Sequence, residues 1–258
     1  MPGMSPLFLL LIATAMAVTE SFILKPNRLC RVQKLNCAES GLIDSRAEII
    51  RLCGHITVGK AVDESLALSI KEQFEIVEKF STRQGIIDNI SLMEGDWLLL
   101  YSTMPRFFHR VALKDVSANT LTSAEPLIIM DSVTQVVKEK SPGVYFYNNR
   151  IEFQGGRENT PSIPGKHTTR GYATHNLADS GEGVLRLDVE FYENEAQSMS
   201  CLKADTDEFS RLFGYPEDET IIAQFPPNFK AWSDVVYLDE DLRLMRGGRG
   251  SMYVLRKV

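Results

Sequence analysis

The sequence contains little cysteine and little histidine, with four residues of each in a chain of 258. No two cysteines have C-x-x-C spacing, which excludes the common zinc-binding patterns. G-x-S-x-G, the phosphate-binding loop and H-E-x-x-H are also absent, so the usual motifs of hydrolases, nucleotide-binding proteins and zinc proteases are missing. The formal charge of −6 excludes the general basic footprint of a nucleic-acid-binding protein. We therefore predict no metal site, no catalytic residue and no nucleic-acid partner.

A long hydrophobic run is missing as well. The apolar stretch 7–18 is too short to span a bilayer comfortably and suits the core of a signal peptide. The segment 22–37 is basic and contains no acidic residue, which is typical of transit peptides. We predict a signal peptide at 1–21, a plastid transit-like segment at 22–37, and no membrane span in the mature chain. Together the two segments resemble the two-part address of proteins in complex algal plastids.

Simple secretion is the alternative destination, and it would make Asn89 a site for an N-linked glycan. The oxidation state of two cysteines depends on this compartment. We expect Cys53 and Cys201 to be buried free thiols, and a disulfide between them in an oxidising compartment stays open.

Helices are predicted at the start of the mature chain, within about 45–80. A short candidate covers 47–53. A stronger one runs from Asp63 to Phe80, with Leu66, Ile70, Phe74 and Val77 at helical spacing. We expect this amphipathic helix to pack on its own domain, and contact with a lipid surface is the alternative.

From Gly95 onward the pattern predicts about ten short strands joined by loops, which favours an antiparallel barrel or sandwich. The clearest strand is 184–192, where Leu185, Leu187, Val189 and Phe191 lie on one side. Two long loops are expected at 154–167 and 195–227, the second with one short helix near 205–209. The remaining strand candidates are 96–101, 111–113, 127–137, 144–147, 151–153, 171–175, 221–225 and 233–238.

The last strands form a predicted hairpin with a glycine-rich turn at 247–250. A four-residue loop would pair Arg246 with Ser251 and would place Leu242, Leu244, Tyr253 and Leu255 on the same face as Arg246. Arg243 would then point the other way. Arg246 either belongs to a salt-bridge cluster on the surface or closes one end of a cavity, and both interpretations depend on this register.

A C-terminal motif resembles the signature of plastid lipid-associated proteins, the fibrillins. It consists of Tyr237-Leu238-Asp239-Glu240-Asp241-Leu242-Arg243, followed by Arg246-Gly247 and Gly250. The stretch 92–102 is similar to the opening strand of that family. Gln135, with Asn148 or Asn149, is similar to its weaker middle elements. The resemblance covers roughly 60–258, and it departs from the family at Ala231 and at 80–85, where proline is missing.

The resemblance implies a mostly β fold, a lipocalin-like antiparallel β-barrel with N-terminal helices packed against or capping it. The family domain would occupy 38–258 and the barrel about 92–258. It also implies a location in plastids, at thylakoids or plastoglobules, and the handling of carotenoids, prenylquinones and other neutral lipids. A barrel of this size can hold a small apolar ligand within its mouth.

We therefore expect a non-enzymatic protein that binds apolar small molecules or a lipid surface and needs no cofactor, although a carotenoid, quinone or lipid would be bound. One alternative is an assembly protein that supports a prenylquinone enzyme or a photosystem, with thylakoid or plastoglobule proteins as partners. Another is an enzyme that modifies a lipid or carotenoid in the barrel. The candidate barrel-lining residues are Trp97, Tyr101, Leu185, Leu187, Val189, Phe191 and Tyr253, with Arg243 and Arg246 as anchors for a polar ligand end.

Overall fold

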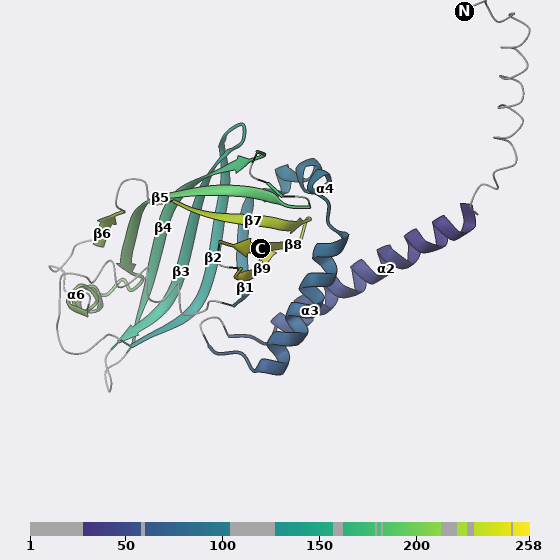
Figure 1. The fold of residues 1–258 in the computed structure, drawn as a ribbon. Coiled ribbons are helices and arrows are strands. Elements are labelled where there is room, and N and C mark those ends of the chain that lie inside the picture. Colours follow the sequence, from purple (N-terminus) through teal and green to yellow (C-terminus); the bar gives the residue numbers. More distant parts are fainter. Residues whose placement is uncertain are drawn as a thin grey trace, which may run out of the picture. The chain divides into compact units, whose positions relative to one another are not determined.

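A computed structural model of the chain describes residues 28–57, 60–103, 127–156, 162–178, 180–181, 183–212, 221–225, 230–248 and 250–258. The predicted signal peptide at 1–21 and the predicted strand at 111–113 lie outside these residues. Of the transit-like segment, the structure describes only 28–37, so its role stays a prediction. The chain divides into two compact units, Met1–Asp44 and Ser45–Val258, and the described strands all belong to the second (Figure 1).

The predicted N-terminal helices are present. Helix α2 spans Arg28–Cys53 and is longer than the predicted 47–53, and α3 spans Glu64–Phe80. The side chain of Asp63 caps α3 by accepting hydrogen bonds from the backbone of Ser65 and Leu66, at 3.0 and 3.2 Å, which satisfies two free amides of the first turn. The shorter helices are α4 (Arg83–Asp88), the 3₁₀ helix η2 (Ile90–Met93) and α6 (Lys203–Leu212).

Eight antiparallel strands close into a ring, which confirms the predicted mostly β, barrel-like fold (Figure 1). Around the ring the order is β1, β2, β3, β4, β5, β7, β8 and β9, with β9 paired back to β1. The ninth described strand, β6, extends the sheet beside β5. The bounds are β1 Gly95–Ser102, β2 Leu127–Ser141, β3 Val144–Gly156, β4 Ile163–Asn176, β5 Leu185–Ser198, β6 Ile221–Gln224, β7 Lys230–Leu238, β8 Leu242–Gly247 and β9 Met252–Lys257.

Strands β3 and β4 are longer than the sequence predicted. The interruption expected at 148–150 lies inside β3, and His167, expected in a loop, lies inside β4. The predictions were wrong because polar side chains point into the barrel in the middle of both strands, so the apolar alternation breaks where the backbone continues. The short helix expected near 205–209 is confirmed by α6.

Two separate layers of side chains are buried. The interior layer contains Trp97, Val133, Tyr147, Leu187 and Val235, among others, and follows the inward positions of the strands. The second layer is buried but is not part of that interior cluster. It lies where α3 and the last turns of α2 cover the outer face of the sheet, and its members are Ile49, Cys53, Ile70, Phe74, Val77, Val236, Leu242, Leu244 and Val254.

The two described cysteines are free thiols, as predicted. Cys53 is buried, and burial raises the pKa of its thiol to about 12, so it stays protonated at neutral pH. Cys201 is exposed, which corrects the expectation that both are buried.

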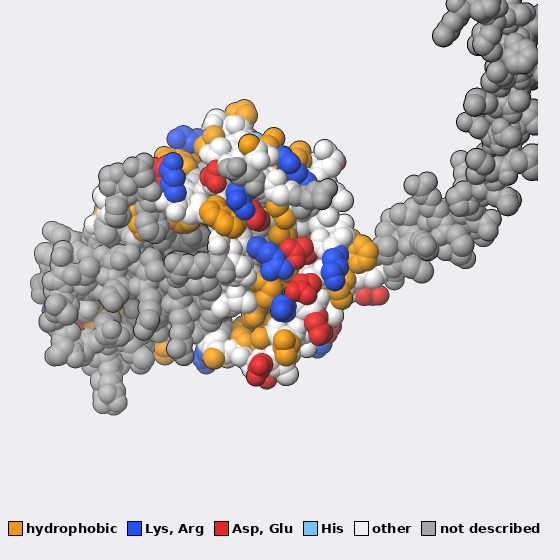
Figure 2. Space-filling view, viewed as in Figure 1, with side chains coloured by type: hydrophobic (Ala, Val, Ile, Leu, Met, Phe, Trp, Pro, Cys, Tyr) orange, Lys and Arg blue, Asp and Glu red, His pale blue; other side chains and the backbone are white. Residues whose placement is uncertain are grey.

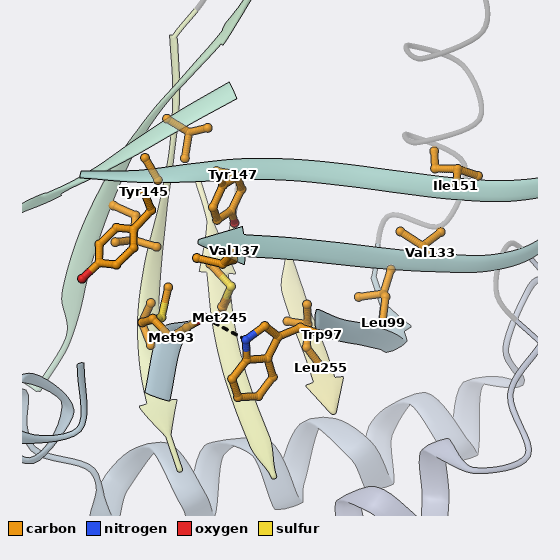
Figure 3. Packing of buried hydrophobic residues seen from close by; sticks show 14 of the residues in the cluster. Met93, Trp97, Leu99, Val133, Val137, Tyr145, Tyr147, Ile151, Met245 and Leu255 are labelled. Carbon is orange, nitrogen blue, oxygen red and sulfur yellow. Dashed lines mark hydrogen bonds between the residues drawn. The ribbon is translucent and has the colours of Figure 1, made fainter. Parts of the chain in front are cut away.

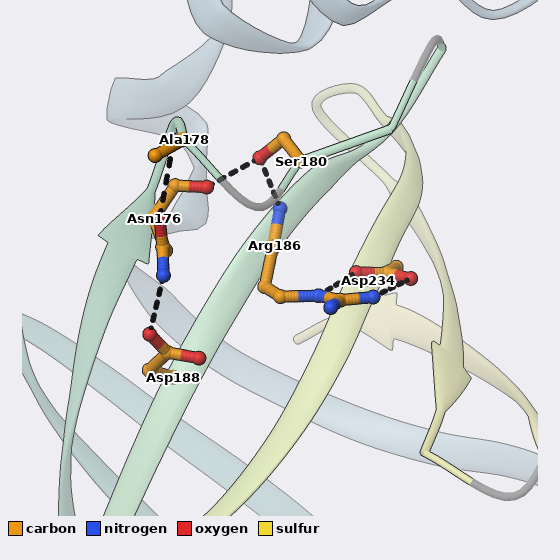
Figure 4. Close-up of polar contacts among 6 residues, drawn as sticks. All are labelled: Asn176, Ala178, Ser180, Arg186, Asp188 and Asp234. Carbon is orange, nitrogen blue, oxygen red and sulfur yellow. Dashed lines mark hydrogen bonds and ion pairs between the residues drawn. The ribbon is translucent and has the colours of Figure 1, made fainter.

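The seam between β5 and β7 is held by polar contacts on the outer side of the barrel. Arg186 on β5 donates two hydrogen bonds to the carboxylate of Asp234 on β7, at 2.8 and 3.0 Å, and its guanidinium lies 3.8 Å from the ring of Trp232 (Figure 4). On the neighbouring strand pair, Asn176 donates to Asp188 at 2.8 Å. Paired planar groups of this kind fix strand register better than isolated surface charges do.

One end of the ring is closed around Trp97 at the start of β1. Its indole Nε1 donates to the backbone oxygen of Met93 in η2 at 2.9 Å, and the ring packs beside Met245 and Leu255 (Figure 3). The ammonium of Lys257 on β9 lies 5.2 Å from the ring centre and donates to the backbone oxygen of Leu92 at 3.1 Å. The first strand, the last strand and the 3₁₀ helix therefore meet at one side chain.

A glycine makes this meeting of strands sterically feasible. Gly95 has φ +124°, and a Cβ at this position would lie 2.7 Å from the Cε atom of Lys257. A larger residue would therefore both strain the backbone and displace the lysine that closes the end of the barrel.

The displayed surface of the second unit mixes acidic, basic and apolar side chains without an extended patch of one sign over its described residues (Figure 2). Among the described residues, no helix has the length and apolar character needed to cross a membrane.

The environment of Trp97 predicts a large loss of stability when the ring is removed. We expect Trp97→Ala to lower the free energy of unfolding by about 3–5 kcal/mol, because a fully buried indole is deleted and a cavity remains. Urea unfolding followed by circular dichroism measures this. Trp232→Ala is the matched control, since Trp232 is 39% exposed and should cost only about 1 kcal/mol. Equal losses in the two variants would contradict the role given to Trp97.

Candidate functional site

A row of polar side chains crosses the interior of the barrel. It begins at Arg243 on β8, passes to Gln135 on β2 and Asn149 on β3, and continues on β4 and β5. These residues occupy inward positions, since they alternate with outward-facing neighbours and share faces with the apolar residues of the interior. We call this set the interior polar row, and its members are Arg243, Gln135, Asn149, Thr169, Asn194 and His167.

Hydrogen bonds join Arg243, Gln135 and Asn149, and another joins Thr169 to Asn194. Arg243 Nη2 donates to Gln135 Oε1, and Gln135 Nε2 donates to Asn149 Oδ1 at 3.1 Å. The guanidinium accepts nothing, so it fixes which end of the Gln135 amide faces it. Asn149 pairs in register with Thr169, whose hydroxyl donates to Asn194 Oδ1 at 2.8 Å. The row is therefore an ordered set of donors and acceptors.

Arg243 is fully buried, with 0% of its surface exposed. Its guanidinium carbon lies 4.6 Å from the centre of the Trp97 ring, and Nη1 lies 3.7 Å from the sulfur of Met93, a weak acceptor. Its Nε has no hydrogen-bond partner among the described residues. Burial lowers the pKa of Arg243 to about 10, which still leaves it positively charged at neutral pH.

The charge of Arg243 has no carboxylate beside it in the described part of the chain. The other arginines near the sheet differ in this respect, because Arg186 pairs with Asp234 and Arg246 with Glu78. Burial lowers the pKa of Arg243, and the titratable neighbour that raises it is the phenol of Tyr147. This phenol is neutral at pH 7. A buried cation without a counter-charge is costly, so a negatively polarised group placed beside Arg243 would stabilise it.

Tyr147 on β3 is buried in the same interior cluster as Trp97 (Figure 3). Burial raises the pKa of its phenol, while the charge of Arg243 and the side chains of Ser233 and Gln135 act in the opposite direction. Tyr147 therefore adds a neutral hydroxyl to the surroundings of the guanidinium.

His167 lies at the other end of the row and is 0% exposed. Neither ring nitrogen has a hydrogen bond of normal geometry within the described residues. Burial lowers the pKa of His167 to about 4, although the side chain of Asn194 and the charge of Glu195 act in the opposite direction, so the imidazole is neutral at pH 7. His167 and His175 lie on the same strand, eight positions apart, and are not neighbours.

The predicted register of the final hairpin was wrong by one residue. Arg246 pairs with Met252 rather than Ser251, and Arg243 pairs with Leu255. Because side chains alternate, a slip of one residue exchanges the faces of a whole strand. Tyr253 and Leu255 therefore share the inner face with Arg243, whereas Leu242 and Leu244 lie on the outer face with Arg246.

Arg246 consequently contacts the outer helix and not the interior. It donates to both carboxylate oxygens of Glu78 on α3, at 2.7 and 2.6 Å, and its guanidinium lies 5.0 Å from the ring of Phe74. Of the two alternatives for Arg246, the geometry matches the salt bridge and not the closure of a cavity. The polar anchor inside the barrel is Arg243.

Tyr101 also lies away from the interior, contrary to the prediction. A β-bulge between Leu99 and Tyr101 changes the alternation of β1, so Tyr101 pairs with the outer-face residue Val254. Its phenol is close enough to Cys53 on α2 for that thiol to raise its pKa, after burial as the main cause. The other predicted lining residues, Trp97, Leu185, Leu187, Val189, Phe191 and Tyr253, do pack in or against the interior cluster.

Sequence reasoning missed most of the interior polar row. The sequence predicts Asn149 between two strands and His167 in a loop, because polar residues are typical of exposed chain. The alternation of Gly165, His167, Thr169 and Gly171 with polar neighbours was the available signal, since small and polar residues can also occupy inward positions.

The whole chain was also compared with known proteins. The PAP_fibrillin family model matches residues 47–256, which include the barrel and the helix that covers it. The chain belongs to the PAP_fibrillin family. This confirms the family predicted from the C-terminal signature.

Two curated relatives match at low identity. A chromoplast-specific carotenoid-associated protein from Cucumis sativus is 24% identical over 228 residues, which cover 76% of this chain and 63% of that protein. A probable plastid-lipid-associated protein 1, chloroplastic, from Arabidopsis thaliana is 24% identical over 216 residues, covering 77% and 64%. The chain thus spans less than two thirds of either relative. No solved structure matches it.

The buried imidazole predicts how stability depends on pH in this family member. The unfolded state binds a proton at His167 near pH 6.5, whereas the folded state binds it near pH 4, so stability is lost as the pH falls through this window. Between pH 7 and pH 5 the loss from this residue should be about 2 kcal/mol. We expect His167→Gln to remove it.

Urea unfolding of both proteins at pH 7 and pH 5 measures the effect. Other titrating groups are common to the two proteins, so the change in their stability difference isolates His167. A difference that does not vary with pH would show that the folded state accepts the proton readily.

Proposed function

We propose that this protein binds a neutral lipid, carotenoid or prenylquinone inside the barrel and acts without catalysis in the plastid, at thylakoids or plastoglobules. The observation that carries the proposal is the interior polar row set within an apolar wall. Two of its buried side chains, Arg243 and His167, keep nitrogens without hydrogen-bond partners among the described residues. Such groups are costly unless a bound molecule or water satisfies them.

The arrangement suits a long apolar molecule with one polar end. Apolar walls supply most of the contact area in ligand sites, and a few placed polar groups fix the orientation of the ligand. Leu185, Leu187, Val189 and Phe191 on β5 would contact the apolar part. Gln135 and Tyr147 would hold a hydroxyl or carbonyl next to Arg243.

The relatives support the proposed class of ligand and the proposed compartment. By their names, one is associated with carotenoids in chromoplasts and the other with plastid lipids in chloroplasts. The low identity and the partial coverage leave the ligand of this chain as a proposal. A plastid location also agrees with the two-part N-terminal address.

The chemistry of the row supports binding rather than catalysis. The buried polar residues found in the described part of the chain are hydroxyls, amides, one imidazole and one guanidinium. The imidazole is neutral over the whole physiological range, since its pKa lies at about 4. Such groups orient a ligand, and none of them has a pKa near 7, which efficient general acid–base catalysis favours.

An assembly role is the second candidate function. Apolar side chains are exposed around α6 and β6, where Met199, Leu202 and Ile222 are 52%, 62% and 55% accessible to solvent. Exposed apolar surface of this kind is typical of protein or lipid contacts. A thylakoid or plastoglobule protein would be the expected partner.

A pair of neighbouring substitutions tests the binding function. Ala173 faces the interior and is buried, whereas Thr174 on the same strand faces solvent. We expect Ala173→Phe to lower the amount of co-purifying pigment, quinone or lipid several-fold by filling the interior, and Thr174→Phe to leave it unchanged. Mass spectrometry of organic extracts, normalised to protein isolated from plastids, measures this. Extracts of the unchanged protein that match those of an unrelated barrel protein would overturn the proposal.

A further inference from the structure

We propose that the barrel also takes an anionic amphiphile, a long-chain carboxylate whose head pairs with Arg243. The inference rests on the proposed function, because it uses the same interior as the binding site. It goes beyond that function, because the lipids, carotenoids and prenylquinones proposed above are neutral. The buried, unpaired positive charge of Arg243 is the observation that carries it.

The other buried contacts of Arg243 leave its charge uncompensated. Trp97 offers the face of a ring, Met93 offers a sulfur, and Gln135 offers one amide oxygen. All three are neutral, and one side of the guanidinium, at Nε, has no acceptor within the described residues. Since an arginine fork binds a carboxylate through two parallel hydrogen bonds, a ligand carboxylate would supply both the charge and the acceptor.

The comparison with Arg246 shows that this is not a general property of the hairpin. Both arginines lie on β8, three positions apart. Arg246 is partly exposed and is already matched by both oxygens of Glu78. Arg243 is fully buried, where the gain from a counter-charge is larger and screening by water is weaker.

The surroundings of Arg243 select an amphiphile rather than a small inorganic anion. Trp97 and Met93 contact the guanidinium, and Met245 and Leu255 pack beside Trp97 in the same cluster, so the adjoining wall is apolar (Figure 3). A hydrated ion would lose its water here without gaining apolar contacts, whereas an acyl chain gains free energy from every buried methylene group. Tyr147 lies near the same guanidinium, and its hydroxyl would donate to the second oxygen of the head.

A matched pair of ligands tests the charge directly. The full-length protein, freed of bound lipid over a hydrophobic resin, is titrated with cis-parinaric acid and with its methyl ester, both fluorescent C18 polyenes. They have the same chain and differ in the negative charge of the head. We expect the acid to bind at least about tenfold more tightly than the ester, as hydrogen bonds to charged groups require.

Three variants localise the effect. Arg243→Gln should weaken binding of the acid by about tenfold to a hundredfold and binding of the ester much less, so that the preference for the acid is lost. Arg243→Lys should keep part of the preference for the acid, because the charge remains while the planar fork is lost. Arg246→Gln removes a charge from the same strand on the outer face, and we expect it to preserve the preference fully.

Each result supports or overturns the inference. Equal affinity of the unchanged protein for acid and ester would overturn the anionic site and leave the proposed lipid binding intact. Binding of neither probe would count against both. Should Arg243→Gln fail to fold, as judged by circular dichroism, the preference of the unchanged protein decides. A preference lost equally in Arg246→Gln would show that the net charge, and not Arg243, attracts the acid.

Discussion

Trp97 is the side chain on which the closure of the barrel depends, because three parts of the chain meet at its ring. η2 receives its indole hydrogen bond through Met93, and β9 places Lys257 against the same ring. From the inside, β8 brings the guanidinium of Arg243 to 4.6 Å from the ring centre. An aromatic face attracts both cations through its quadrupole, so one residue connects the first strand to the last two.

This closure explains why the interior is electrostatically unusual. Arg243 is fully buried against Trp97 and Met93, so its polar partners have to lie inside the barrel. Gln135 accepts a hydrogen bond from Arg243 and donates one to Asn149, so the orientation of its amide also fixes the contact with Asn149. The hydrogen bonds of Gln135 and Asn149 thus begin at a guanidinium that lies next to Trp97. This arrangement makes this region the natural place for the polar end of a ligand.

The two arginines of the last hairpin show where sequence reasoning works and where it stops. Both arginines lie in an apolar strand, where a charged side chain needs a partner. Which of them faces the interior depended on the register, and the register depended on a single residue in the glycine-rich turn. The same limit applies to Tyr101. Its side chain lies on the outer face because of a β-bulge that the local sequence pattern does not indicate. The apolar positions of β5 were predicted correctly because their alternation is uninterrupted.

By itself the sequence determined the family, the mostly β fold, the capped helix after Asp63 and the apolar face from Leu185 to Phe191. These features depend on local patterns and on a distinctive C-terminal signature. Only the tertiary structure decided that Gln135, Asn149, Thr169, Asn194 and His167 share one interior with Arg243. They come from four different strands, and contacts between distant strands follow from how the sheet closes, which no short stretch of sequence encodes.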